Sequence, residues 1–251
     1  MKKITINMLS SADKVDGQGV GSAYLEQVSL VKEGAKDLFD VKINDKKDAD
    51  IMHYHTVDLP HYFKMGKTKG VNVAYVHFLP TTLDGSIKLP RPAFAVFKKY
   101  VVNFYNKADH LVVVNPSFID ELEKIKIPKE KVTYIPNYVS KESFFKEKKS
   151  VRNKIREKYG IKEDDFVVLG VGQVQTRKGV LDFIEVAKKL PKVKFVWCGG
   201  FSFGKITDGY NEYRIISSKP QGLTTYDKIL VSGNIDRNTN RITNASIIKE
   251  K

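Results

Sequence analysis

The chain has 251 residues, 41% of them hydrophobic and 29% charged, and it carries a formal net charge of +14. This length and composition predict one large or two smaller folded domains and argue against a disordered protein. The charge predicts an anionic partner, which could be nucleic acid, a lipid surface or a phosphorylated small molecule.

The sequence can form no intrachain disulfide and shows only weak signals for secretion and membrane insertion. The single cysteine, Cys198, excludes an intrachain disulfide, and its apolar setting favours a core residue over a nucleophile. The first residues, MKKITINMLSSADK, contain too short an apolar run for a secretory signal. No segment approaches the ~18 to 20 apolar residues of a membrane-spanning helix. We therefore expect a cytoplasmic protein whose membrane contacts are peripheral.

Short apolar strands alternate with helical segments in the first 145 residues. Helices are predicted to begin near Val20, Arg91 and Ser117. Near-continuous apolar strands separated by helices indicate a parallel sheet covered on both faces. The predicted strands are residues 3–9, 40–43, 49–55, 71–78, 110–115 and 131–136.

The pattern restarts after a charged segment, residues 146–165, and the polar tail builds no further strand and helix pair. We therefore predict an α/β protein with a complete N-terminal Rossmann-like domain, residues 1–145, and an incomplete C-terminal one, residues 146–251. The second sheet is expected to have an exposed edge. Its predicted strands are residues 166–172, 192–200 and 228–235.

Three glycines, Gly17, Gly19 and Gly21, precede the first helix. Glycine lets a ligand approach the backbone closely, and a helix N-terminus offers N–H groups to an anion. The G-x-G-x-G spacing, and the residues SSADKV between strand and glycines, argue against a nicotinamide fingerprint. A flexible loop without a ligand is an equally good interpretation.

The histidines suggest two different roles. His53 and His55 share one face of a strand, and with Asp58 and His61 they could form a metal site, although hydrogen-bonded core residues are favoured. His77 follows a strand at its carboxyl end, where ligands bind in open α/β sheets, and is the better functional candidate. The sequence DAD at 48–50 resembles an Asp-x-Asp metal motif but is more simply interpreted as a polar approach to a strand.

Residues 87–107 predict an amphipathic helix preceded by two cations. The helix could pack on its sheet, or its aromatic side chains could enter a membrane while its basic residues meet anionic headgroups. Both could hold for different parts of the segment. The candidate membrane-binding residues are Lys88, Arg91, Phe94, Phe97, Lys98, Lys99 and Phe104.

A basic elbow lies between the strand ending in Gly172 and the helix that follows Gly179. Its adjacent cations, Arg177 and Lys178, concentrate positive potential beside a helix N-terminus, which suits a diphosphate. A solvated basic turn is the alternative.

In order, these segments resemble the retaining family-4 glycosyltransferases of the GT-B fold, which has two Rossmann-like domains. More narrowly, they resemble the bacterial enzymes that glucosylate diacylglycerol glycolipids. The resemblance covers roughly residues 1–235. It rests on GQGVGSAYLEQ, ADIMHYHT, VAYVHFLP, ADHLVVVNPSFIDELEKIKIPKEKVTYIPN and VLGVGQVQTRKGVLDFIEVAKKLP.

The resemblance implies that the N-terminal domain binds the acceptor and the C-terminal domain binds a nucleotide-sugar, with UDP-glucose expected. By the same resemblance, Gly19 and Gly21 would approach the donor phosphates, and His77 would contact the donor sugar near the reacting carbon. Lys178, with Arg177 beside it, would neutralise the diphosphate leaving group. Such stabilisation replaces a metal ion, so neither a metal nor another cofactor is implied, and no protein nucleophile is assigned.

The chain departs from the family in two places. Many members have Gly-Arg after the strand where this chain has Gly172 and Gln173, so one cation is absent from the expected donor site and Arg177 could substitute for it. The family's E-x-x-x-x-x-x-x-E segment, which holds the donor's ribose and sugar, would follow a later strand, and the sequence stops before it. We therefore expect a chain truncated at its C-terminus.

The main functional hypothesis is a glycosyltransferase, peripheral on the inner face of the cell membrane. It would transfer glucose from UDP-glucose to a glycolipid acceptor with retention of configuration. The alternative is a catalytically incomplete remnant that binds an anionic lipid surface. A nucleic-acid partner is not expected, because the lysines are spread along the chain without a recognised binding motif.

Overall fold

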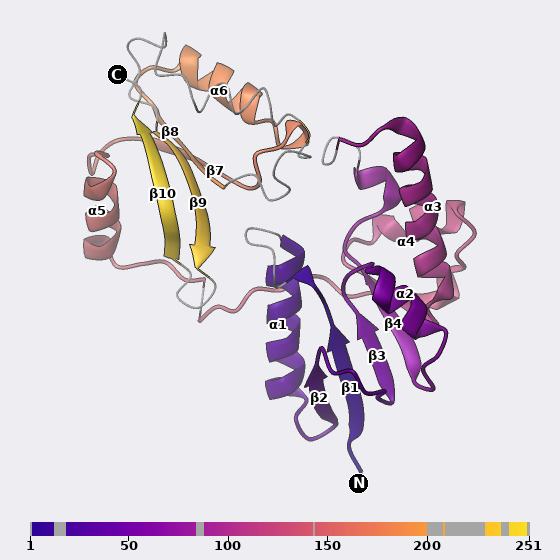
Figure 1. Ribbon diagram of the computed structural model, residues 1–251. Coiled ribbons are helices and arrows are strands. Elements are labelled where there is room, and N and C mark those ends of the chain that lie inside the picture. Colours follow the sequence, from indigo (N-terminus) through magenta and orange to yellow (C-terminus); the bar gives the residue numbers. More distant parts are fainter. Residues whose placement is uncertain are drawn as a thin grey trace. The chain divides into compact units, whose positions relative to one another are not determined.

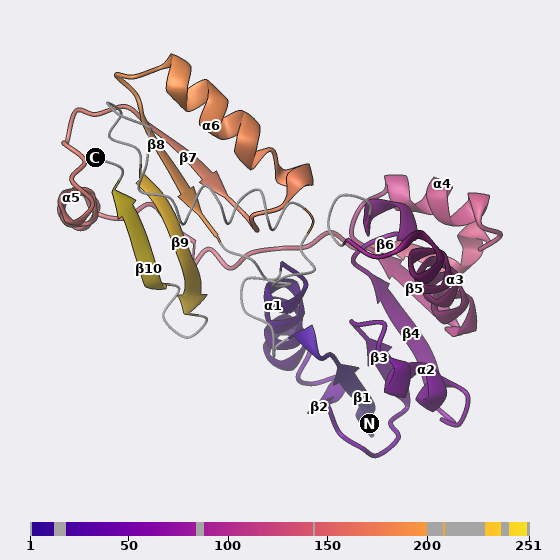
Figure 2. The same cartoon turned by 45° about the horizontal axis from the view of Figure 1, so that its top comes forward.

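The computed structural model describes residues 2–12, 19–83, 88–142, 144–199, 208, 229–236 and 241–249. Contacts divide the chain into two compact units. Unit 1 comprises Met1–Asp84 and Leu89–Ser140, and unit 2 comprises Gly85–Lys88 and Lys141–Lys251. Each unit combines a β-sheet with helices and is described by itself (Figures 1 and 2).

Unit 1 is built on a six-stranded sheet in which all neighbouring strands are parallel. The strand order is β2-β1-β3-β4-β5-β6, so the carboxyl ends of all six strands lie at one edge. The strands are β1 (Ile4–Leu9), β2 (Phe39–Ile43), β3 (Ile51–Tyr54), β4 (Val71–Val76), β5 (His110–Val113) and β6 (Val132–Tyr134). The helices are α1 (Gly19–Gly34), α2 (Leu59–Met65), α3 (Arg91–Lys107) and α4 (Ser117–Lys124), with short 3₁₀ turns η2 (Pro80–Leu83) and η3 (Lys129–Lys131).

Two apolar layers cover the sheet of unit 1. Successive strand side chains point to opposite faces, so Met8 packs with Tyr24 of α1 while the next residue, Leu9, joins the cluster on the other face. That second cluster is the larger, and it is formed with α2, α3 and α4. Its central side chains include Met52, Tyr54, Met65, Val101, Phe104, Tyr105, Leu111 and Leu122. Burial on both faces explains why these strands are almost continuously apolar in sequence.

Unit 2 is built on a four-stranded sheet with the order β10-β9-β8-β7. Strands β7, β8 and β9 are parallel, and β10 runs antiparallel to β9. Trp197 of β8 packs edge-on against Phe183 of α6, which places α6 over β7 and β8. The elements are α5 (Lys149–Lys158), β7 (Val167–Val171), η4 (Thr176–Lys178), α6 (Val180–Lys189), β8 (Lys194–Cys198), β9 (Ile229–Asp236) and β10 (Arg241–Lys249).

The structure has a strand in each predicted strand segment, and α1, α3 and α4 begin within one residue of their predicted starts. One strand was not predicted: the polar tail, which was expected to build no further strand and helix pair, adds strand β10 to the second sheet. An antiparallel strand needs no crossover helix, so the tail lacks the strand and helix pattern on which the prediction rested. The prediction also missed α2, a helix of seven residues that is too short to show a clear period.

Candidate functional site

A cluster of neutral aromatic side chains lies at the carboxyl edge of the unit 1 sheet. Alternation along β3 places His53 and His55 on one face, and the pairing of β3 with β4 brings His55 beside Tyr75 and His77. Tyr75 stacks on His55 at 5.0 Å between ring centroids and on His77 at 4.8 Å. Nδ1 of His55 lies 3.4 Å from Nε2 of His77. The structure thus connects His77 with a histidine that sequence reasoning assigned to the core.

Burial keeps the three histidines of this cluster uncharged. It lowers the pKa of His53 and of His77 to about 4, and that of His55 well below the usual 6.5, with smaller contributions from neighbouring rings at His53 and His55. At neutral pH each ring therefore has one N–H group and one lone pair. This edge of unit 1 can donate or accept hydrogen bonds, but its histidines bring no positive charge to a ligand.

His53 and His55 are buried, as the favoured interpretation of core residues predicts, but among the described residues only His55 has a hydrogen-bond contact, at Nδ1. Both ring nitrogens of His53 and Nε2 of His55 are buried without a hydrogen-bond partner in the part of the chain that the structure describes. Asp58 and His61, the other candidate ligands, contact each other instead, with Oδ2 of Asp58 3.4 Å from Nδ1 of His61. Within the described residues, no group of three or more His, Cys, Asp or Glu could hold a metal ion.

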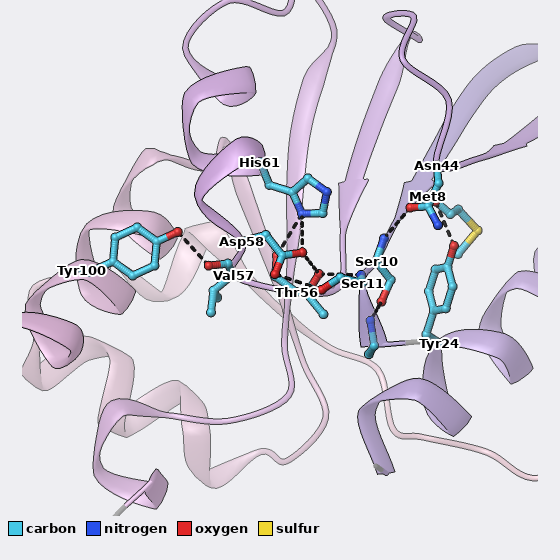
Figure 3. A network of polar contacts seen from close by, with 11 residues as sticks. Met8, Ser10, Ser11, Tyr24, Asn44, Thr56, Val57, Asp58, His61 and Tyr100 are labelled. Atoms are coloured by element: carbon cyan, nitrogen blue, oxygen red, sulfur yellow. Dashed lines mark hydrogen bonds and ion pairs between the residues drawn. The ribbon is translucent and has the colours of Figure 1, made fainter. Parts of the chain in front are cut away.

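Asp58 is the centre of a polar network that fixes the chain just after β1 (Figure 3). Ser11 Oγ donates to one carboxylate oxygen of Asp58 at 2.9 Å, and Thr56 Oγ1 donates to the other at 2.6 Å. The backbone N–H of Ser11 in turn donates to Thr56 Oγ1. On the neighbouring strand end, Ser10 N–H donates to Asn44 Oδ1. These bonds hold the first residues of the segment that leads to Gly19.

Helix α1 begins at Gly19, near the carboxyl end of β1. A side chain added at Gly19 would meet no atom within 4 Å, so the backbone there is open, whereas Gly21 is buried. The first turn of α1 has no acidic side chain that would compete with an anion. The phenol of Tyr24 ties α1 to β1 by donating to the Met8 carbonyl at 3.0 Å. Gly17 lies outside the described residues.

The basic elbow of unit 2 lies where β7 ends and α6 begins. Gly172, with φ of 154°, directly follows β7, and its backbone N–H donates to the Cys198 carbonyl at the end of β8. The Lys178 side chain passes over Gly172, because a Cβ added there would lie 3.8 Å from Cδ of Lys178. Gly179 then adopts the left-handed conformation, φ 69°, that turns the chain into α6. These conformations bring Lys178 back over the strand end.

Positive charge is concentrated at this elbow. Arg177 and Lys178 are adjacent and exposed at the N-terminal end of α6. Partial burial, and then the charge of Arg177, lower the pKa of Lys178, so the protonated amine is less stable here than in water. An anion bound between them would relieve that repulsion.

Gln173 is also part of the unit 2 edge. Its Oε1 accepts a bond of 2.6 Å from Nε2 of Gln175, a residue with no exposed surface. Trp197 Nε1 donates to the Gly172 carbonyl at 3.0 Å, which fixes the backbone before Gln173. Sequence reasoning missed Gln175 and Trp197, although both lie beside strand ends.

The predicted membrane helix divides into two halves. In its C-terminal half Phe104 is 1% exposed, so the expectation that Phe104 contacts a membrane is wrong: it packs in the core of unit 1. In its N-terminal half Arg91 and Lys99 are exposed, while Phe94 and Phe97 are half-buried. Lys98 Nζ lies 4.5 Å from the centroid of the Phe94 ring. Lys88 is exposed and belongs to unit 2.

Exposed apolar side chains lie on α2 and on the N-terminal half of α3, and we call these residues together the α2–α3 face. Its members are exposed by 58% at Leu59, 60% at Phe63 and 70% at Val96. A ring contact connects the two helices, because the ring centroids of Tyr62 and Tyr100 lie 5.6 Å apart. Tyr62 precedes Phe63 in α2, and Tyr100 is one turn after Val96 in α3. Among the described residues, no helix is long and apolar enough to cross a membrane.

Sequence comparisons give two curated relatives and a family match. Residues 37–143 match the family model described as Glycosyltransferase Family 4. The chain is 49% identical over 221 residues to the alpha-galactosylglucosyldiacylglycerol synthase of Streptococcus pneumoniae (strain ATCC BAA-255 / R6), covering 87% of this chain and 59% of that protein. It is 27% identical over 210 residues to the processive diacylglycerol alpha-glucosyltransferase of Acholeplasma laidlawii, covering 82% of this chain and 60% of that protein. The chain thus spans about three fifths of each relative.

Solved structures with the same fold include Anabaena HepE in complex with UDP-glucose. The TM-score is 0.67 at 15% identity, covering 91% of this chain and 69% of that one. HepE in complex with UDP and glucose gives a TM-score of 0.61 at 16% identity, covering 85% and 64%. These similarities confirm the predicted α/β architecture of the GT-B type.

Proposed function

We propose, starting from the match of residues 37–143 to Glycosyltransferase Family 4, that this chain takes part in transferring a hexose to a membrane glycolipid. The donor is UDP-glucose, the acceptor is built on diacylglycerol, and the anomeric configuration is retained. The names of the two curated relatives support the acceptor class, and the UDP-glucose complex of HepE supports the donor. Because the chain spans about three fifths of those relatives, the activity itself is part of the proposal.

The observation that carries the proposal is the basic elbow of unit 2. Lys178 and Arg177 lie beside the N-terminus of α6, and each of these features favours an anion. When the bond between sugar and diphosphate breaks, negative charge grows on the leaving diphosphate, and fixed cations stabilise it without reorganisation. In this proposal the two cations do the work that a metal ion does in other enzymes, so no metal is required.

Unit 1 contributes uncharged groups to the same reaction. The backbone at Gly19 and Gly21 approaches the donor phosphates, and His77 contacts the donor sugar near the reacting carbon. A neutral imidazole suits this place, because a cation there would oppose the positive charge that develops on the sugar ring. We assign acceptor binding to unit 1 and nucleotide-sugar binding to unit 2.

The α2–α3 face is the proposed contact with the membrane. Exposed apolar side chains lie there beside Arg91, Lys98 and Lys99, which matches an anionic lipid surface. We accordingly propose a cytoplasmic protein, peripheral on the inner face of the cell membrane, where a glycolipid acceptor is accessible.

The test is thermal unfolding of the 251-residue chain with UDP-glucose, UDP or uridine. A ligand that binds the native state alone stabilises it by about 2.7 kcal/mol at a concentration 100 times its Kd. We expect UDP-glucose and UDP to raise the unfolding temperature and uridine, which lacks the diphosphate, to have a much smaller effect.

Lys178→Ala should remove most of the stabilisation by UDP. Lys189→Ala is the matched control, because Lys189 is exposed at the far end of α6 and should leave the shift unchanged. Equal shifts in both variants would show that the elbow does not bind the diphosphate, and no shift in the unmodified chain would contradict donor binding.

A further inference from the structure

His55 and His77 form a pair whose protons are interdependent. Their contact joins Nδ1 of His55 to Nε2 of His77 at 3.4 Å. Burial lowers the pKa of both rings, so at neutral pH each has a single N–H. A hydrogen bond between two neutral rings needs one donor and one acceptor. The position of the proton on His55 therefore decides its position on His77.

Two arrangements satisfy this contact. In the first, His55 donates from Nδ1, which leaves a lone pair on its Nε2 and places the proton of His77 on Nδ1. In the second, His77 donates from Nε2, which places the proton of His55 on its own Nε2. The arrangements differ in what His77 offers at Nδ1, its other nitrogen: an N–H in the first and a lone pair in the second.

The surroundings of His55 favour the first arrangement. Its Nε2 is buried without a hydrogen-bond partner among the described residues, and the rings of Tyr24 and Tyr75 lie against the imidazole. The second arrangement would bury an N–H donor there, and orphaned buried N–H groups are rarer in proteins than under-satisfied acceptors. The first arrangement buries only a lone pair.

We propose that His55 is a positioning residue that holds His77 in the Nδ1–H tautomer, so that His77 meets its ligand as a hydrogen-bond donor. The ligand atom at this place must then offer a lone pair, as a sugar hydroxyl oxygen or a phosphate oxygen does. His77 cannot act there as a general base, because its Nε2 lone pair is engaged by His55 and its Nδ1 carries the proton. The identity of the ligand rests on the proposed function, whereas the tautomer is a property of the unliganded chain.

The test is NMR of the full chain with ¹⁵N-labelled histidine. The chain has five histidines, so a long-range ¹H–¹⁵N correlation spectrum is readable, and replacing each histidine by glutamine in turn assigns it. At pH 7 we expect His77 to show a protonated Nδ1 and an unprotonated Nε2. A protonated Nε2 on His77 would overturn the proposal.

Two variants of His55 separate the hydrogen bond from packing. His55→Asn keeps an amide N–H near the place of Nδ1 and should preserve the Nδ1–H tautomer of His77. His55→Phe keeps a ring but has no donor, so the Nε2–H form of His77 should become populated, and turnover with UDP-glucose should fall by about 10- to 100-fold with a smaller change in KM. An unchanged tautomer in the Phe variant would contradict the proposal. If the Phe variant does not fold, the tautomer of His77 in the unmodified chain alone decides whether the proposal holds.

Failure of this proposal is distinguishable from failure of the proposed function. An Nδ1–H tautomer on His77 without stabilisation by UDP-glucose would leave the pairing intact and reject the donor. Stabilisation by UDP-glucose with an Nε2–H tautomer on His77 would support donor binding and reject the pairing.

Discussion

His53 makes the stability of unit 1 depend on pH. Its pKa is lowered to about 4 in the folded protein by burial, while in the unfolded chain it returns to about 6.5. Between these values the unfolded state binds the proton and the folded state does not, so the free energy of unfolding decreases as pH falls. The stabilisation is complete above pH 6.5 and is lost as pH falls towards 4.

We expect this loss to be about 1.4 kcal/mol per pH unit for His53 between these two pKa values. Urea unfolding measured from pH 7.5 to 4.5 should therefore show a slope that becomes shallower in His53→Phe. The matched control is His110→Gln, which replaces a histidine outside the cluster that contacts Thr133. The carboxyl of Asp50, whose pKa is lowered from 3.8 by hydrogen bonds from Thr5, titrates below this range. Identical slopes in the unmodified chain, His53→Phe and His110→Gln would show that His53 does not cause the pH dependence.

At the scale of elements, the ends of β7 and β8 depend on glycine. Gly199 has φ of 148°, and a side chain added there would overlap the backbone of Gly172. Gly199→Ala should thus separate the two strand ends and displace the elbow that begins at Gly172. Gly160 also has positive φ, 65°, but a side chain there would meet nothing within 4 Å.

Urea unfolding of two alanine variants measures this difference. Gly160→Ala should cost about 1 to 2 kcal/mol from backbone strain alone. Gly199→Ala should cost more and should also reduce stabilisation by UDP, which Gly160→Ala should leave intact. A smaller cost at Gly199 than at Gly160 would show that the strand ends can separate without penalty.

The strands of both units could be predicted because each one is a short apolar run between polar segments. Helix α3 shows the limit of this reasoning: periodicity placed Phe97 and Phe104 on one face, and only the packing shows that the face enters the core along half of its length. The pairing of His55 with His77 needs the register between β3 and β4, which sequence alone does not supply. In retrospect, the repeated pattern of HYH and YVH at two strand ends was the available signal.

At the scale of the whole molecule, the net charge of +14 and the α2–α3 face should act together at a membrane. We expect the chain to float with vesicles containing phosphatidylglycerol and to be released as salt screens the attraction. Phe63→Ser should weaken binding by about tenfold or more, since burying such a side chain contributes about 1.5 to 3 kcal/mol. The matched control is Leu38→Ser, because Leu38 is 64% exposed and lies outside both helices.

Vesicle binding and nucleotide binding together distinguish the two functional hypotheses. Flotation with stabilisation by UDP-glucose supports the transferase, whereas flotation without it supports a lipid-binding remnant. Equal flotation of the Phe63 and Leu38 variants would indicate that the α2–α3 face is not the contact surface.

Helix α3 also acts as a spacer of fixed length. The Tyr105 hydroxyl near its C-terminal end donates to the carbonyl of Phe78, the residue after His77, at 2.8 Å. Val96 on the exposed half lies nine residues earlier, or about 14 Å along the helix at 1.5 Å per residue. Because the far half is locked in the core, this separation cannot shorten. If the α2–α3 face contacts the membrane as proposed, a lipid acceptor whose glycerol lies level with Val96 reaches His77 only through its headgroup, so we expect headgroup length to decide which acceptors are used.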